Sequence, residues 1–178
     1  MGRVPNFSII FFTNCVAKCH IVSYNDTKWF KARKADKVFL GEYQHIMDSK
    51  GRVVIPSKFR KELQQGCVVT KGQDNCLQIL TKKSWTSLSE EMVDLPVTEK
   101  SSRQLRRAIF SGAVDSKLDS AGRIPIPENL RKYSQIDING EVTVTGIGNV
   151  IEIWSSKMWK KIQDDADHEF ANINEVKG

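Results

Sequence analysis

Short runs of apolar residues, separated by Gly, Pro, Asp and Asn, recur along residues 38–154. Each run has the length of a β-strand, and the separating residues favour turns. The pattern predicts strands at 44–47, 52–55, 67–71 and 76–80, and again at 114–118, 123–126, 141–145 and 150–154.

Longer stretches place apolar residues three or four positions apart, which is the spacing of one helix face. These stretches predict helices at 82–92, 98–110 and 155–172. Thr98 is the expected N-cap of the second helix, because its hydroxyl can accept a hydrogen bond from the first turn. Shorter helices are expected directly after two prolines, which suit a first helical turn; they lie at 57–63 and 128–133.

One motif occurs twice. Residues 48–61 return as 119–132 at an offset of 71, and eight of the fourteen positions are identical. The match extends upstream, where Phe39 corresponds to Phe110, and continues downstream at an offset of 74. A repeated short unit indicates that each copy needs the other to bury its apolar face.

The repeat predicts the organisation of the chain. A copy of about fifty residues buries too little surface to fold alone. Two copies whose strands interleave can close into a small barrel with few free edges and a pseudo-twofold axis. We therefore expect a leader, a first repeat, a connecting helix, a second repeat and a tail, at 1–37, 38–95, 96–110, 111–172 and 173–178.

Charge is concentrated at the start of the chain. Of the net charge of +6, the seven basic and two acidic residues of 1–37 contribute +5, which leaves +1 for 38–178. DNA binding by the repeats would therefore depend on local patches. Residues 1–37 are a poor signal peptide. We expect them to be either a disordered basic tail or sequence translated upstream of a native start near Val38.

The cysteines do not form a predicted metal site. Cys15 and Cys19 make a CxxxC pair in the leader, but no second pair at ligand spacing follows. Cys67 and Cys76 flank a predicted hairpin and are expected to be buried free thiols rather than a disulfide. No cofactor is expected, and no segment has the roughly 20 apolar residues of a membrane helix.

An enzyme is not expected. His20, His45 and His168 are scattered, and no nucleophile turn or Gly-rich phosphate loop accompanies them. His45 is expected to be a strand residue with an ordinary hydrogen-bond partner.

The candidate chemistry lies in the repeated turn. The same three residue types surround each turn: Asp48, Gly51 and Arg52 in the first copy, and Asp119, Gly122 and Arg123 in the second. A two-stranded β-ribbon fits the major groove, and Arg pairs bidentately with guanine. Phosphate contacts could come from nearby cations, namely Lys50, Arg60, Lys61, Arg131 and Lys132. Alternatively, the Asp–Arg pairs are only hairpin staples, worth about 0–1 kcal/mol each when exposed.

These features together resemble the MraZ family of bacterial transcriptional regulators. The resemblance rests on residues 39–43 (FLGEY), the two Asp-x-x-Gly-Arg turns with Ile-Pro after each, 110–113 (FSGA) and 148–154 (GNVIEIW). It covers about 39–172.

The resemblance implies an α+β fold in which two tandem AbrB-like (SpoVT-AbrB) half-repeats form a swapped-hairpin β-barrel with flanking helices. It implies a ring-shaped homo-oligomer that binds short direct repeats of double-stranded DNA in its own promoter, at the head of the division and cell-wall gene cluster, usually to repress it. The expected location is the cytoplasm and nucleoid, with no membrane partner and no small-molecule ligand.

The resemblance also implies site residues. Arg52 and Arg123 would contact DNA, with Asp48 and Asp119 beside them; Lys50, Gly51 and Gly122 complete the predicted set. This chain departs from the pattern at two positions in the second copy. Pro125 stands where an aliphatic residue is usual, so a less regular turn is expected. Ala121 stands where the first copy has Lys50, which removes one phosphate contact.

A different function class shares the same fold. An AbrB-like antitoxin, or another protein-interaction regulator, would use the fold without reading a promoter directly. A toxin partner is normally bound by a disordered tail, and the stretch after Asn172 is short. DNA binding by the purified chain favours the regulator, whereas a pull-down that survives removal of nucleic acid favours the alternative.

Overall fold

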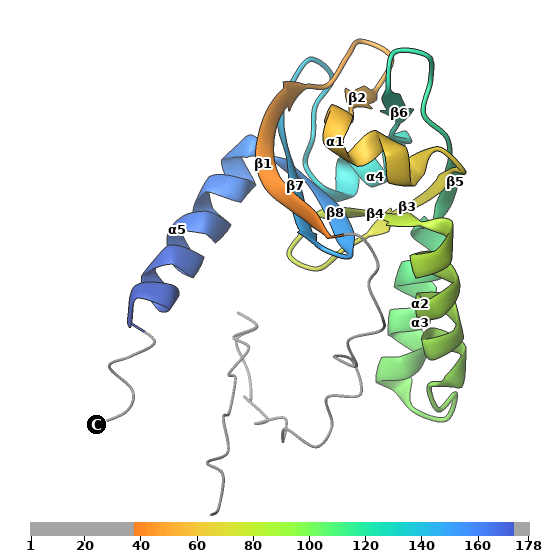
Figure 1. Cartoon of the computed structure of the whole chain (residues 1–178). Coiled ribbons are helices and arrows are strands. Elements are labelled where there is room, and N and C mark those ends of the chain that lie inside the picture. Colours follow the sequence, from red (N-terminus) through yellow and green to blue (C-terminus); the bar gives the residue numbers. More distant parts are fainter. Residues whose placement is uncertain (1–37, 173–178) are drawn as a thin grey trace, which may run out of the picture. The chain divides into compact units, whose positions relative to one another are not determined.

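The computed structural model describes residues 38–172 of the 178-residue chain (Figure 1). The predictions for the leader, for Cys15 and Cys19, and for the tail after Asn172 lie outside the described residues. The first copy contains β1 (Phe39–Ile46), β2 (Arg52–Val54), α1 (Ser57–Arg60), η3 (Lys61–Leu63), β3 (Cys67–Lys71), β4 (Leu77–Thr81) and α2 (Lys82–Asp94). The helix α3 (Lys100–Gly112) connects the copies, and the second copy contains β5 (Val114–Ser116), β6 (Arg123–Pro125), α4 (Glu128–Tyr133), β7 (Glu141–Gly148), β8 (Val150–Ser155) and α5 (Ser156–Asn172).

The strands of the two copies interleave. Six strands form one antiparallel sheet in the order β1-β7-β8-β4-β3-β5, and β2 pairs with β6 in a separate two-stranded ribbon. The first strand of each copy crosses to the other copy, because β1 pairs with β7 and β5 pairs with β3. The predicted exchange of strands between copies is therefore confirmed.

A pseudo-twofold axis relates the copies. In the ribbon, Val53 is paired with Ile124, which is its own counterpart at the offset of 71. Where β4 meets β8, Gln78 is paired with Glu152, again its own counterpart at the offset of 74. Pairing between equivalent residues is what a twofold axis through both ladders requires.

The predicted closed barrel is wrong for the residues that the structure describes. The sheet ends at β1 on one side and β5 on the other, and the β2–β6 ribbon is not hydrogen-bonded to either edge. The ribbon covers the open side by packing instead, since Val53 and Ile124 have no exposed surface.

The core is shared by both copies. Its fully buried side chains come from strands of each, with α1 and α4 closing it through Phe59 and Leu130. Phe59 packs edge-on against Phe39 and Tyr43 of β1, with ring centroids 5.3 and 5.4 Å apart. Because the core takes side chains from each copy, folding of one copy depends on the other.

Three local predictions differ from the structure. Phe39 lies buried in β1, whereas its repeat counterpart Phe110 lies in α3, so the upstream sequence match does not mark equivalent structure. The N-cap of α3 is Glu99 rather than Thr98, and no side chain caps it. The strand β7 continues through Gly146, where the sequence predicts a turn.

Gly146 is in the strand because two backbones approach closely there. It is paired with Gly41 of β1, and a Cβ on Gly146 would collide with the backbone of Phe39 and Leu40. In the part of the chain that the structure describes, no helix is long and apolar enough to cross a membrane.

Candidate nucleic-acid interface

Each Asp side chain builds the turn that it begins. In the first copy, Asp48 Oδ1 accepts the backbone N–H of Lys50 at 2.9 Å and that of Arg52 at 2.8 Å. The backbone N–H of Gly51 donates to the carbonyl of Asp48 at 2.9 Å, and that of Asp48 donates to the carbonyl of Arg52 at 2.9 Å. The side chain thus satisfies backbone groups at the tip that would otherwise lack a protein partner.

The second turn has the same geometry. Asp119 Oδ1 accepts the N–H groups of Ala121 and Arg123, both at 2.9 Å, and the two backbone bonds are again 2.9 Å. The expected irregularity from Pro125 is therefore wrong. Pro125 is paired with Arg52 in the ribbon. The cross-strand hydrogen bonds are formed by the neighbouring positions; for example, the N–H of Ile126 donates to the carbonyl of Gly51 at 2.8 Å. No ladder hydrogen bond is needed at Pro125, because bonded and non-bonded pairs alternate.

The two arginines and two aspartates form one cluster. Arg52 donates from Nε to Asp48 Oδ2 at 2.7 Å, and its Nη1 reaches Asp119 Oδ2 of the other copy at 3.3 Å. Arg123 donates from Nε to Asp119 Oδ2 at 2.9 Å, and its Nη1 lies 3.7 Å from Asp48 Oδ2. The pairing of β2 with β6 therefore brings Arg52 and Arg123 to one place, where the four side chains of the cluster are 26–30% exposed.

The cluster is electrically balanced. Hydrogen bonding from the Arg52 side chain is the main cause that holds the pKa of Asp48 below its usual value. For Asp119, the backbone N–H of Arg123 is the leading cause that lowers the pKa. Both carboxylates are therefore charged at neutral pH, and they offset the two guanidinium charges.

Each turn glycine lies under an arginine from the other copy. Gly51 and Gly122 have φ of +70° and +75°, a conformation that favours glycine. A Cβ on Gly51 would lie 3.1 Å from Nε of Arg131, and one on Gly122 would overlap the guanidinium of Arg60. The two glycines are accordingly buried.

Arg60 and Arg131 are also held in place by hydrogen bonds to backbone carbonyls. Arg60 Nε donates to the carbonyl of Ile55 at 2.7 Å, and Arg131 Nε donates to that of Ile126 at 3.1 Å. The sequence suggested phosphate contacts for both residues and did not suggest that they cover the turns. Their identity at the repeat offset was the one available signal.

The remaining predicted cations differ in availability. Lys50 is exposed at the tip of the first turn, and Lys61 is exposed on η3. Lys132 is exposed too, but its Nζ pairs with Glu128 Oε1 at 2.7 Å. Ala121 occupies the tip of the second turn, so the cationic tip belongs to the first copy alone.

Two cysteines and one histidine are the other titratable groups with shifted pKa values that the sequence analysis considered. Cys67 and Cys76 are buried free thiols, as predicted. Burial raises the pKa of Cys67 to about 11 and that of Cys76 further, so neither is a thiolate at neutral pH. Burial, with the Arg60 charge, lowers the pKa of His45, whose Nε2 has no partner among the described residues. The ordinary partner expected for His45 is thus not found.

The comparison with protein families agrees with the internal repeat. The family model described as "MraZ protein, putative antitoxin-like" matches residues 38–108 and again residues 109–177. Each match contains one Asp-x-x-Gly-Arg turn, one ribbon strand and the helix that follows it. Together the two matches cover most of the chain, and the protein therefore belongs to the MraZ family, with two MraZ domains in tandem.

Proposed function

We propose that this protein is a sequence-specific DNA-binding transcriptional regulator that reads double-stranded DNA with its two Asp-x-x-Gly-Arg turns. The observation that carries the proposal is the convergence of Arg52 and Arg123, from separate copies, on one partly exposed site. Figure 1 shows the β1–β2 and β5–β6 turns at the same end of the fold.

The cluster geometry suits base reading. Asp48 and Asp119 hold the guanidinium groups in fixed orientations, so less side-chain entropy is lost when they meet a base. The antiparallel β2–β6 ribbon has dimensions that the major groove admits. A bidentate Arg–guanine pair discriminates against a wrong base by about 1–3 kcal/mol.

The balanced cluster supplies no net attraction for phosphate, so backbone affinity must come from elsewhere. Exposed Lys50, Lys58 and Lys61 surround the first turn and its helix. We further propose that several copies assemble in a ring, so that each bound copy raises the effective concentration at the next. The target would be short direct repeats in the protein's own promoter, before the division and cell-wall genes, with repression as the outcome in the cytoplasm and nucleoid.

The first test removes both arginines. Arg52→Ala/Arg123→Ala should weaken binding to DNA from upstream of the gene at least about tenfold at fixed salt, because two base-reading side chains are lost. Fluorescence anisotropy measures the affinity, and Lys100→Ala/Lys157→Ala is the matched control for lost charge. If Arg52→Ala/Arg123→Ala binds DNA like the wild type, with the same helicity and particle mass, the proposal is wrong.

A salt titration provides the second test. If the proposal holds, the logarithm of the binding constant falls linearly with the logarithm of salt concentration, with a slope near −0.9 per phosphate neutralised. Lys50→Ala should reduce this slope without changing the preferred sequence, since a phosphate contact carries no base information. An unchanged slope for Lys50→Ala would contradict its assignment to phosphate.

Protein binding is the second candidate function. It is favoured by the antitoxin-like description of the family and by the internal pairing of the Asp–Arg cluster. A partner protein captured by the nuclease-treated chain, with no binding to its own upstream DNA, would support this candidate over the first.

A further inference from the structure

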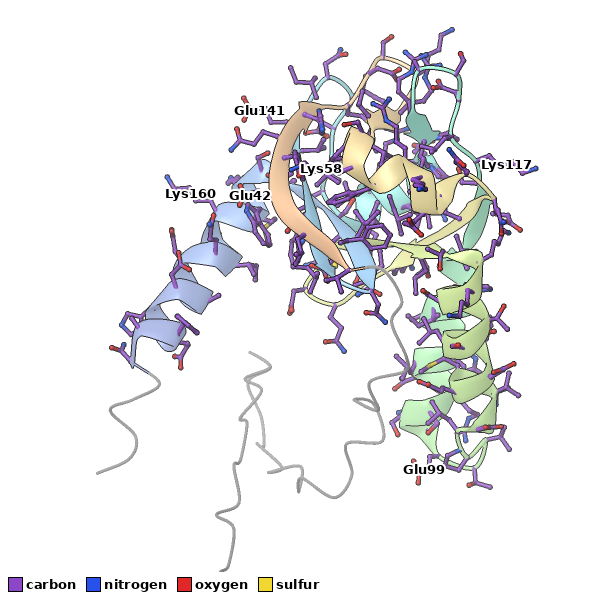
Figure 2. All side chains as sticks on the ribbon, in the orientation of Figure 1. Glu42, Lys58, Glu99, Lys117, Glu141 and Lys160 are labelled. Carbon is purple, nitrogen blue, oxygen red and sulfur yellow. The ribbon has the colours of Figure 1, made fainter. Side chains whose placement is uncertain are left out.

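Most of the last helix, α5, extends away from the rest of the described fold. At its start, Ser156 hydrogen-bonds Thr143 of β7 at 3.1 Å, and Trp159 packs 5.7 Å from Trp154 of β8. None of the residues of α5 is buried, and Phe170 is 79% exposed. Figure 2 shows no other described element beside the C-terminal half of α5.

The pseudo-twofold axis shows what α5 lacks. Its counterpart is α2, which packs beside α3 through an edge-on contact of Trp85 with Phe110 at 5.7 Å. Met92 of α2 is buried, whereas the equivalent Ala166 of α5 is exposed. No described helix takes the place of α3 beside α5, and residues 163–171 are exposed.

The charges of α5 are arranged against its own dipole. Basic side chains occupy its first half and acidic ones its second half: Lys157, Lys160 and Lys161, then Asp164, Asp165, Asp167 and Glu169. A helix is stabilised by the opposite distribution, with anions near the N-terminus and cations near the C-terminus. Lys-to-acid pairs four residues apart are also the weaker orientation within a helix. This arrangement disfavours α5 as an isolated helix, which at seventeen residues is marginal in water.

We propose that α5 pairs antiparallel with α5 of a second copy of this chain. An antiparallel partner places its basic half beside the acidic half of the first helix, and it opposes the two helix dipoles favourably. The unfavourable distribution within one helix then becomes complementary between two.

The helical positions fix the register. At 100° per residue, Met158, Ile162, Ala166 and Phe170 form one apolar stripe. A twofold axis near Asp164 sets Ile162 opposite Ala166 of the second copy, and Met158 opposite Phe170. The same register flanks one side of the stripe with opposite charges: Lys161 faces Asp165 of the second copy, and Asp165 faces the Lys161 of the second copy.

This contact is independent of the proposed DNA site. It is isologous and joins copies in pairs, unlike the head-to-tail contacts of a ring. Figure 1 shows α5 leaving the sheet away from the two turns. Failure of the α5 contact would therefore leave DNA binding by a single copy unchanged, and loss of DNA binding would leave the α5 contact intact.

The test exchanges charges in the full-length chain. Lys161→Glu and Asp165→Lys each turn both flanking pairs into repulsions, so each should weaken self-association about tenfold. The double variant Lys161→Glu/Asp165→Lys restores both pairs with reversed sign and should associate like the wild type. Mixing the two single variants should restore association between them, as measured by sedimentation velocity at low salt.

The double variant and the mixture control for folding, because both contain the same substitutions as the non-associating chains. A wild-type chain that stays monomeric at high micromolar concentration would overturn the proposal. It would also be overturned if the single variants kept the wild-type particle mass, or if neither the double variant nor the mixture recovered it.

Discussion

Arginine side chains that cover a turn impose a steric demand on the residue beneath them. Gly122 meets two requirements, a positive φ and room for Arg60, while Gly51 has the same φ region but a less crowded neighbour in Arg131. Gly148 has φ of +66°, and a methyl group added there would meet no atom within 4 Å, so it isolates the cost of conformation alone. The three glycines therefore separate backbone strain from close approach.

Replacing these glycines by alanine should give graded losses of stability. Gly148→Ala should cost about 1 kcal/mol from the left-handed conformation. Gly122→Ala should cost about 2–3 kcal/mol, because Arg60 must also leave its hydrogen bond to Ile55. Urea denaturation measures these values. Adding Arg60→Ala to Gly122→Ala should recover the steric part, and equal losses at Gly122 and Gly148 would contradict the overlap.

The Asp–Arg cluster should contribute to stability in a pH-dependent way. Because the folded-state pKa values of Asp48 and Asp119 are lowered, their contribution is present above the ordinary carboxyl pKa near 4 and is lost as pH falls through the lowered values. Asp48→Asn/Asp119→Asn should be less stable at pH 7 and should lose less stability between about pH 4 and pH 2. Thermal unfolding across this range checks it, and parallel curves for the two proteins would count against the cluster.

The sequence predicted the residues of the cluster and the Asp–Arg pair within each turn, but not the bonds between the two turns. The repeated Asp and Arg identified the turn, and the Asp-x-x-Gly spacing predicted its shape. That Arg52 bonds to Asp119 depends on the pairing of β2 with β6, which joins residues far apart in the chain. The covering role of Arg60 depends on the same pairing, so no local pattern could reveal it.

Strands and helices were predicted well where their periodicity is local. The helices α1, α4 and α5 and the strand β3 lie close to their predicted ranges. The errors occur at residues whose type or sequence match is compatible with two different local structures. Gly146 favours a turn on sequence grounds because glycine is common in turns, but here it permits the close approach of β1. Phe110 lies in α3, close to the helix predicted at 98–110, so its sequence match with Phe39 of β1 was misleading.

Gly146 should therefore be sensitive to the smallest side chain. Gly146→Ala places a methyl group against the backbone of β1, which should cost about 1–3 kcal/mol, as overpacking does elsewhere. Amide hydrogen exchange should show faster exchange in β1 and the facing part of β7 than in β4. Uniform exchange changes across the sheet would contradict a local collision.

The whole molecule depends on exchange between its halves. Each half lacks a neighbouring strand and part of its core when the other is absent. Fragments 38–108 and 109–177 should thus be unfolded separately and should regain helix and sheet when mixed. Circular dichroism of the single fragments and of their mixture measures this. A fragment with a cooperative thermal transition by itself would show that the interleaving is dispensable.

The crossing of β1 to β7 has a consequence for synthesis of the protein. Phe39 cannot pair in the sheet until its partner Gly148 has been synthesised. At ~5–20 residues per second on the ribosome, that delay is roughly 5–20 s, during which an eight-residue strand has emerged without its neighbour. Completion of the sheet therefore has to follow synthesis of β7.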